Sequence, residues 1–319
     1  MILSDTLWAV IKLLAGFAML FFGGDWLVSG GVALARRFRI SPLVIGMTIV
    51  AFGTSAPELL VSLTSAIKGV SGIAMGNVLG SNIANIGLIL GLTAIICPIV
   101  TDNRKVLING TIMILASLLV TLFSHNSGIS GTEGAILLLC IMAFTVISVM
   151  KGRAKGQESD IQSEDSKITL KLFPAIALII LSCAMLAYGA DILVDGATTL
   201  ARNVGISEKV IGLTVVALGT SLPELAASVA AAIKKQMDIS IGNIIGSNIF
   251  NLLCVLGASA AIKPISFEFD NYLYDFVFVL IFSVALLLFT TFGRQKGRLG
   301  RVAGIILLTS YIIYITLLF

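Results

Sequence analysis

The chain repeats itself: polar motifs recur 166 residues apart inside apolar segments. Residues 53–58 read GTSAPE and residues 219–224 read GTSLPE, while residues 76–85 read GNVLGSNIAN and residues 242–251 read GNIIGSNIFN. The register holds without a gap across residues 25–98 of the first copy. The repeat predicts two related halves, and the polar groups that it places among apolar residues mark a candidate site.

Composition predicts an integral membrane protein. The 319 residues are 57% hydrophobic and 12% charged, with a mean hydropathy of +1.05, whereas a soluble domain has roughly 25% charged residues. Several apolar runs reach the length of about 20 residues that crosses a lipid bilayer. The net charge of +4 comes from loop residues, so we expect no nucleic-acid partner.

The reactive side chains offer little support for enzyme chemistry. The four cysteines lie singly, with no CxxC pair, and the one histidine, His125, lies in a short polar turn. These residues indicate no disulfide framework, no zinc site and no Ser-His-Asp triad. We therefore expect neither an enzyme nor a bound cofactor.

Apolar patterning predicts ten helices in an all-α membrane protein. They fall near residues 5–34, 41–67, 72–98, 105–124, 130–151, 170–201, 207–233, 238–262, 271–291 and 299–318. The polar segment between the halves predicts a solvated linker. The expected division is a first five-helix repeat over 1–151, a linker over 152–169 and a second five-helix repeat over 170–319.

Five helices per half is an odd number, so the second half must enter the membrane from the opposite side, as in an inverted-topology repeat. Sixteen of the 21 lysines and arginines collect on one side of the predicted helices. Because positive loops stay in the cytoplasm, both termini are expected outside and the linker inside, in a multi-pass protein of the plasma (inner) membrane.

Two prolines predict broken helices in the middle of apolar segments. Pro57 has no N–H and its ring clashes with the carbonyl of Gly53, so the helix should break there and free the carbonyls near Ala51 and Gly53. Pro223 repeats this arrangement in the second half. We expect the helices at 72–98 and 238–262 to be broken as well, around a central ion site.

The repeated segments carry an all-oxygen set of candidate ligands. They supply two carboxylates, six hydroxyls and two amides: Glu58, Glu224, Thr54, Thr220, Ser55, Ser221, Ser81, Ser247, Asn85 and Asn251. Oxygen ligands without thiolate or imidazole suit hard cations such as Ca²⁺ and Na⁺. These helices contain no basic residue except at their ends, so one Ca²⁺ would neutralise the two carboxylates and Na⁺ would compete for the same oxygens.

Other polar residues have blander interpretations. Glu58 and Glu224 could instead be protonated structural acids, and the hydroxyls could bond to the preceding helical turn. Four further asparagines are expected to satisfy backbone groups at the helix breaks and not to bind the ion: Asn77, Asn82, Asn243 and Asn248. Asp25 and Asp191 are expected to have structural or vestibule roles, and Asp195 a local one.

The paired GTS-x-PE and GN-x-x-GSN-I-x-N motifs resemble the two alpha-repeats of the cation/calcium exchanger superfamily, and most of all its sodium/calcium exchanger branch of compact prokaryotic type. The likeness covers nearly the whole chain. It implies electrogenic exchange of several Na⁺ for one Ca²⁺, with Glu58 and Glu224 as central ligands and the hydroxyls around them. It further implies that Ala51 and Ala217 contribute backbone carbonyls and that Asn85 and Asn251 line the middle of the site.

Departures from the family pattern sharpen these expectations. Some relatives, including potassium-dependent ones, have Asp at the position of Asn251, so two acids instead of three favour transport that is independent of K⁺. The large regulatory loop of the animal exchangers is absent, and one chain is expected to function as a monomer. The alternatives are a Ca²⁺/H⁺ antiporter and a passive cation channel.

Overall fold

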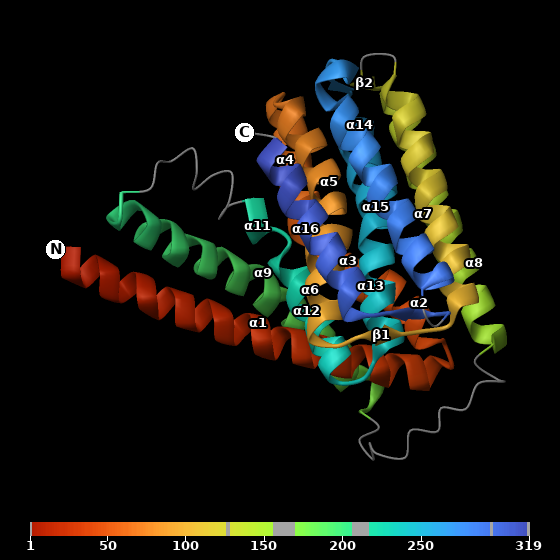
Figure 1. Ribbon diagram of the computed structural model, residues 1–319, viewed down its shortest axis with the longest axis horizontal. Coiled ribbons are helices and arrows are strands. Elements are labelled where there is room, and N and C mark those ends of the chain that lie inside the picture. Colours follow the sequence, from red (N-terminus) through yellow and green to blue (C-terminus); the bar gives the residue numbers. More distant parts are fainter. Residues whose placement is uncertain (1, 126–127, 156–169, 206–216, 294–295, 318–319) are drawn as a thin grey trace.

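The structure is a computed structural model that describes residues 2–125, 128–155, 170–205, 217–293 and 296–317. These residues are almost entirely helical. Two long helices, α1 (Ile2–Phe38) and α9 (Leu172–Asn203), lie side by side and project from a bundle formed by the other helices (Figure 1).

The remaining helical elements follow the two halves of the chain. The first half continues with α2 (Pro42–Ile45), the π-helical η1 (Gly46–Val50), α3 (Ala51–Thr54), α4 (Ala56–Lys68), α5 (Ser71–Ala84), the π-helical η2 (Asn85–Leu90), α6 (Gly91–Ile96), α7 (Asn103–Ser124) and α8 (Gly131–Lys155). The second half continues with α11 (Ala217–Gly219), α12 (Leu222–Ile233), α13 (Met237–Phe250), the π-helical η4 (Asn251–Val255), α14 (Leu256–Ile262), the 3-10 turn η5 (Phe269–Tyr272), α15 (Leu273–Phe292) and α16 (Arg301–Leu317).

Seven helices in the described residues are long and apolar enough to cross a membrane, and a bent pair makes an eighth. Two further apolar helices, α12 and α16, are shorter. The ten crossings and the inverted arrangement of the halves therefore stay predictions. The start of the segment predicted at 207–233 and most of the linker lie outside the described residues, while α8 extends to Lys155, past the predicted start of the linker at 152.

The break at Pro57 is confirmed. The segments Pro42–Thr54 and Ala56–Lys68 meet at Ser55 with a bend of 49°. One part of the prediction is wrong, because the carbonyl of Ala51 keeps its partner and accepts a hydrogen bond from the Ser55 N–H at 3.0 Å. In the second half the Ser221 N–H bonds to the Leu218 carbonyl at 3.1 Å instead, one residue closer than the Ala51–Ser55 pattern.

The predicted breaks in the helices near 72–98 and 238–262 are also wrong. Ser71–Ile96 and Met237–Ile262 are each one apolar span. Each passes through a π-helical segment that begins at Asn85 or Asn251. The wider π turn changes the direction of the side chains without interrupting the helix, and such turns are frequent at functional sites.

Helices α1 and α9 run antiparallel. As the residue numbers increase along α1, those of the contacting residues on α9 decrease. Gly16 lies against the carbonyl of Gly189, and Gly30 lies against Ile179. A Cβ at Gly16 would approach the Gly189 carbonyl oxygen to 2.6 Å, so only glycine allows this approach. Small residues at such contacts are typical of helix packing in membranes.

The two halves interlock at their ends. Strand β1 (Ile99–Val100) pairs with β4 (Arg298–Leu299), and β2 (Gly128–Ile129) pairs with β3 (Ile265–Ser266), both antiparallel. In each pair, one strand follows the third predicted helix of one half. The other strand precedes the fifth predicted helix of the other half. Close glycine contacts join the same parts of the two halves, because Gly91 packs on Gly304 and Gly257 packs on Gly134.

Candidate ion-binding site

The two glutamates occupy equivalent places beside helix breaks. Glu58 lies in the first turn of α4 and Glu224 in the first turn of α12, in both cases directly after a proline. Each residue is only 1% exposed. The N-terminal end of a helix favours a negative charge, because its free N–H groups point toward it.

One hydrogen bond brings the halves together at this place. The Ser55 hydroxyl donates to Glu224 Oε1 at 2.7 Å, across 169 positions of sequence. Two of the predicted ligands, one from each repeat, therefore meet in the buried interior. The reciprocal bond from Ser221 to Glu58 is not formed between these described residues, so the two-fold symmetry suggested by the repeat is incomplete.

Most of the predicted oxygen ligands are buried. Ser81, Ser247, Asn85 and Asn251 are at most 5% exposed, and Thr54, Ser55 and Ser221 are at most 3% exposed. Thr220 is only half-buried, unlike its counterpart Thr54. Ala51 is fully buried, whereas Ala217 opens α11 at the edge of the described chain.

Several of these oxygens lack a hydrogen-bond partner. Among the buried polar atoms of the described residues, the unpaired ones include Glu58 Oε2, Glu224 Oε2, Ser247 Oγ, Asn251 Oδ1 and both polar atoms of the Asn85 amide. Leaving a buried polar group unpaired costs about 1–3 kcal/mol, and more when it is charged. Five of the predicted site residues share this property, and their oxygens are the type that a hard cation binds.

The glutamates have no basic partner in the described residues. The ion pairs found there include those of Lys12 with Asp195, Lys105 with Asp238 and Lys234 with Asp25. The part of the chain that the structure describes also contains no cluster of three or more His, Cys, Asp or Glu residues that could hold a metal. A cation bound at this place would have to rely on two carboxylates and neutral oxygens.

Thr54 connects the repeats a second time. Its hydroxyl lies 3.2 Å from Asn243 Oδ1 and 3.3 Å from the Ala51 carbonyl. The hydroxyl has a single proton, so it donates to one of these acceptors at a time or shares the proton between them. In either case the oxygen lone pairs of Thr54 stay free to accept.

The four asparagines left out of the predicted ligand set contact backbone carbonyls, but only Asn77 and Asn243 do so beside a helix break, as expected. Asn77 Nδ2 donates to the Glu58 carbonyl at 3.1 Å, and Asn243 Nδ2 donates to the Glu224 carbonyl at 3.4 Å. Asn82 Nδ2 donates to the Asn248 carbonyl, and Asn248 Nδ2 to that of Ile244. In addition, the Asn251 amide donates to Asn82 Oδ1 at 3.2 Å. This bond links the start of η4 to α5.

Sequence reasoning missed two serines in this network. Ser62 accepts from Asn77 Nδ2 at 2.9 Å, and Ser228 accepts from Asn243 Nδ2 at 3.0 Å. Both are fully buried. The signal was present, since Ser62 and Ser228 are matched across the repeat and each follows a glutamate by one helical turn.

The aspartates of α1 and α9 lie in ion pairs or at the surface. Asp25 pairs with Lys234 at 2.6 Å beside an apolar cleft of about 370 Å³ between α1 and α12. Asp191 is exposed. Asp195 pairs with Lys12 of α1 at 2.5 Å, an exposed contact between neighbouring helices that fits the local role expected for it.

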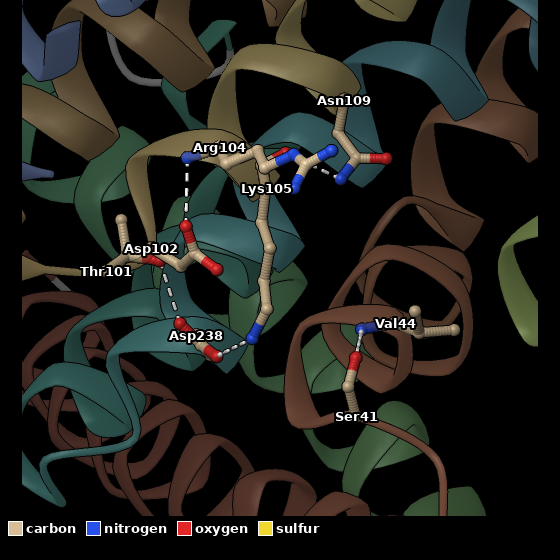
Figure 2. A network of polar contacts seen from close by, with 8 residues as sticks. All are labelled: Ser41, Val44, Thr101, Asp102, Arg104, Lys105, Asn109 and Asp238. Atoms are coloured by element: carbon tan, nitrogen blue, oxygen red, sulfur yellow. Dashed lines mark hydrogen bonds and ion pairs between the residues drawn. The ribbon is translucent and has the colours of Figure 1, made fainter. Parts of the chain in front are cut away.

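A second polar cluster anchors the start of α13 (Figure 2). Asp238, in the first turn of α13, accepts a hydrogen bond from the Thr101 hydroxyl at 2.8 Å and lies 3.5 Å from Lys105 Nζ. Asp102 caps α7 by accepting from the Arg104 N–H. The cluster fixes the end of the helix that carries Asn243, Ser247 and Asn251, and sequence reasoning did not predict it.

Known proteins resemble this chain along nearly its whole length. The family model described as "Sodium/calcium exchanger protein" matches residues 8–150 and 174–319, once in each half. The membrane protein MJ0091 of Methanocaldococcus jannaschii is 37% identical over 95% of both chains. The sodium/calcium exchanger MaX1 of Methanosarcina acetivorans is 32% identical over 96% of this chain and 97% of its own length.

A solved structure matches the fold equally well. The sodium-calcium exchanger NCX_Mj soaked with zero Na⁺ and Ca²⁺ superposes with a TM-score of 0.84 at 35% identity. The match covers 98% of this chain and all of the other. The helical architecture described above is therefore shared with a protein of known structure.

Proposed function

The chain belongs to the sodium/calcium exchanger protein family, and from this premise we propose that it exchanges Na⁺ for Ca²⁺ across the membrane by alternating access. Family membership makes it a cation/calcium antiporter of the membrane and places it outside the catalytic enzymes. The observation that carries the finer proposal is the set of buried, unpaired oxygens around Glu58 and Glu224.

In this proposal the two glutamates are the central ligands. The hydroxyls and amides around them complete an oxygen shell, with backbone carbonyls from Ala51 and Ala217. The proposed ligands from the two halves are Glu58, Thr54, Ser55, Ser81, Asn85 and Ala51, with Glu224, Thr220, Ser221, Ser247, Asn251 and Ala217. Ca²⁺ takes six to eight oxygens in flexible geometry, which a shell of this size can supply.

Charge balance explains the competition between the ions. Two carboxylates without a basic partner repel each other, and one Ca²⁺ brings the site to neutrality. Several Na⁺ ions on the same oxygens relieve the repulsion as well. Because both ions need the same ligands, the protein can carry one kind at a time, and this is the condition for exchange.

The proposed architecture has ten transmembrane helices in two inverted halves, with both termini outside and the linker in the cytoplasm. The antiparallel α1 and α9 support it, since these helices open the two halves and run in opposite directions. The match of the family model to each half supports it too. A single chain contains the whole proposed site, so we propose that it works as a monomer.

Two other functions would use the same oxygens. A Ca²⁺/H⁺ antiporter would load protons on Glu58 and Glu224, and its flux would follow a pH gradient. A passive channel would conduct Ca²⁺ without accumulating it against a gradient. All three functions are compatible with glutamates that have no basic partner, so a flux measurement is needed to distinguish them.

The test is Ca²⁺ uptake into proteoliposomes loaded with Na⁺, at equal pH on both sides. We expect uptake against a Ca²⁺ gradient that disappears when Na⁺ is equal inside and outside. Glu58→Gln and Glu224→Gln should each lower uptake at least tenfold, because each removes half of the negative charge from a buried site.

The matched control is Glu133→Gln. Glu133 is a half-buried residue in the first turn of α8 that accepts hydrogen bonds from Ser130. None of these contacts involves a proposed ligand, so its change should leave uptake intact. Uptake that ignores the Na⁺ gradient would contradict the exchange, and uptake that survives both substitutions in α4 and α12 would contradict the site.

A further inference from the structure

We propose that Asn77 and Asn243 are positioning residues that hold the two carboxylates in register with the other ion ligands. Neither residue belongs to the proposed ligand set. The inference rests on the proposed function, because it gives both asparagines a role in the same ion site.

In the first half the Asn77 amide of α5 is hydrogen-bonded to two groups on one turn of α4, an arrangement that we call a staple. It donates to the Glu58 carbonyl at 3.1 Å and to Ser62 Oγ at 2.9 Å. Glu58 and Ser62 are four residues apart and hence on one face of the helix. The contact fixes the turn that begins at Glu58, immediately behind the break, to α5.

Along α5 the same face continues into the site. Ser81 follows Asn77 by four residues, and Asn85 follows Ser81 by four. Asn77 therefore joins the two helices at one end of the polar stripe that Ser81 and Asn85 extend. Its hydrogen bonds decide which residues of α5 lie opposite the Glu58 carboxylate.

The second half builds the same staple from matched positions. Asn243 Nδ2 donates to the Glu224 carbonyl at 3.4 Å and to Ser228 Oγ at 3.0 Å. The Ser240 hydroxyl reinforces this contact by donating to the Ser228 carbonyl at 2.9 Å. One arrangement formed twice, at positions 166 residues apart, indicates a shared role in both halves.

Helices in a membrane need such a device because apolar packing alone sets their register weakly. Lipid tails are as apolar as the helix surfaces, so polar pairs and close contacts decide which residues face each other. A slip of one helical turn moves a side chain by about 5.4 Å. Ca²⁺ accepts ligand distances within only about 2.3–2.6 Å, so a loosened staple would weaken ion binding.

The test is the dissociation constant for Ca²⁺ of the purified full-length protein, measured by calorimetry without Na⁺. Asn77→Ala and Asn243→Ala should each raise the Kd about three- to tenfold, because each variant loses the buried hydrogen bonds that order a ligand. Ser62→Ala and Ser228→Ala should raise it in the same direction. These two variants remove only a hydroxyl and carry the test if an asparagine variant does not fold.

The matched control is Asn109→Ala. The Asn109 amide also donates to a backbone carbonyl, that of Lys105 at 2.8 Å, but it lies on α7 outside the site (Figure 2). This variant should lower thermal stability without changing the Kd. A Kd within about twofold of the native value in the folded variants of Asn77, Asn243, Ser62 and Ser228, or an equal shift in Asn109→Ala, would overturn the proposal.

A second measurement separates this inference from the proposed function. Hydrogen exchange of the first turns of α4 and α12 should be faster in Asn77→Ala and Asn243→Ala respectively, even without ions. If the native protein bound neither Ca²⁺ nor Na⁺, the proposed function and the ion-positioning role would both fail, although faster exchange would still show the staple. If the native protein bound Ca²⁺ and exchange did not change in the variants, only the positioning role would fail.

Discussion

At the scale of single residues, the most informative contact is the one between Ser55 and Glu224. The sequence matches Ser55 with Ser221 and Glu58 with Glu224, and this symmetry would give two equivalent cross-repeat bonds. The structure forms the Ser55–Glu224 bond at 2.7 Å and leaves Oε2 of both glutamates without a partner. The two carboxylates thus occupy matched positions of the repeat but have different hydrogen-bond partners in the structure.

This difference predicts unequal effects of two matched substitutions. Ser55→Ala removes the donor to Glu224 Oε1 and should destabilise the ion-free protein by about 1–3 kcal/mol. Ser221→Ala removes a hydroxyl with no carboxylate partner and should destabilise it less. The measurement is the apparent melting temperature in detergent without Ca²⁺ and Na⁺, and equal losses in both variants would contradict the asymmetry.

At the scale of elements, the break at Ser55 controls the direction of α4. Pro57 removes one backbone N–H, so the two segments bend by 49° and Glu58 lies in the first turn after the bend. The spans Ser71–Ile96 and Met237–Ile262 are not broken, and each contains a π-helical segment that keeps the helix continuous. The proline signal is visible in the sequence, whereas no residue type announces the π segment.

The bend predicts the effect of restoring the missing N–H. Pro57→Ala allows residue 57 to donate to the Gly53 carbonyl, and the segment should straighten and move the Glu58 carboxylate away from the other proposed ligands. We expect a weaker Ca²⁺ affinity and slower Na⁺-driven uptake with unchanged or higher thermal stability.

The control for this substitution is Pro174→Ala. Pro174 lies exposed in the first turn of α9, where a helix needs no N–H from it, so its removal should leave uptake at the native rate. Native affinity in Pro57→Ala would show that the proline is not required for the geometry of the site.

At the scale of the whole molecule, each half completes the other. The ribbons β1–β4 and β2–β3 and the contacts Gly91–Gly304 and Gly134–Gly257 all join the end of one half to the other. The single proposed ion site likewise takes one glutamate from each half. Neither repeat is therefore expected to fold or bind ions alone.

A charge count for the whole transport cycle predicts a response to membrane potential. If more than two Na⁺ leave for each Ca²⁺ that enters, net positive charge moves outward, and a potential that is positive inside should accelerate Ca²⁺ uptake. The measurement is uptake into Na⁺-loaded vesicles with the potential clamped at positive, zero and negative values. Uptake that does not respond to potential would contradict electrogenic exchange.

The same vesicles test independence from K⁺. With two acids in the site and Asn at position 251, replacing external K⁺ by choline at zero potential should leave the uptake rate unchanged. A requirement for K⁺ would show that the third acid is not what confers potassium dependence here.

The sequence by itself supplies the residues of the proposed site and the kind of chemistry that their side chains can perform. Charged residues and prolines inside apolar segments are costly in a bilayer, so their positions can be recognised without a structure. For this reason the break at Pro57 and the two buried glutamates, Glu58 and Glu224, were predictable, and the oxygen ligands proposed around them come from the sequence as well.

Only the tertiary structure decided which of these groups meet. The register between helices sets the hydrogen bond from Ser55 to Glu224 and the contacts of Asn77 and Asn243 with α4 and α12. The continuous helices through Asn85 and Asn251 are likewise seen only in the folded protein. Apolar helix surfaces in lipid carry little information about register, because many offsets bury equal area. The polar contacts that select one offset join residues far apart in the chain, and only the folded protein brings them within reach of one another.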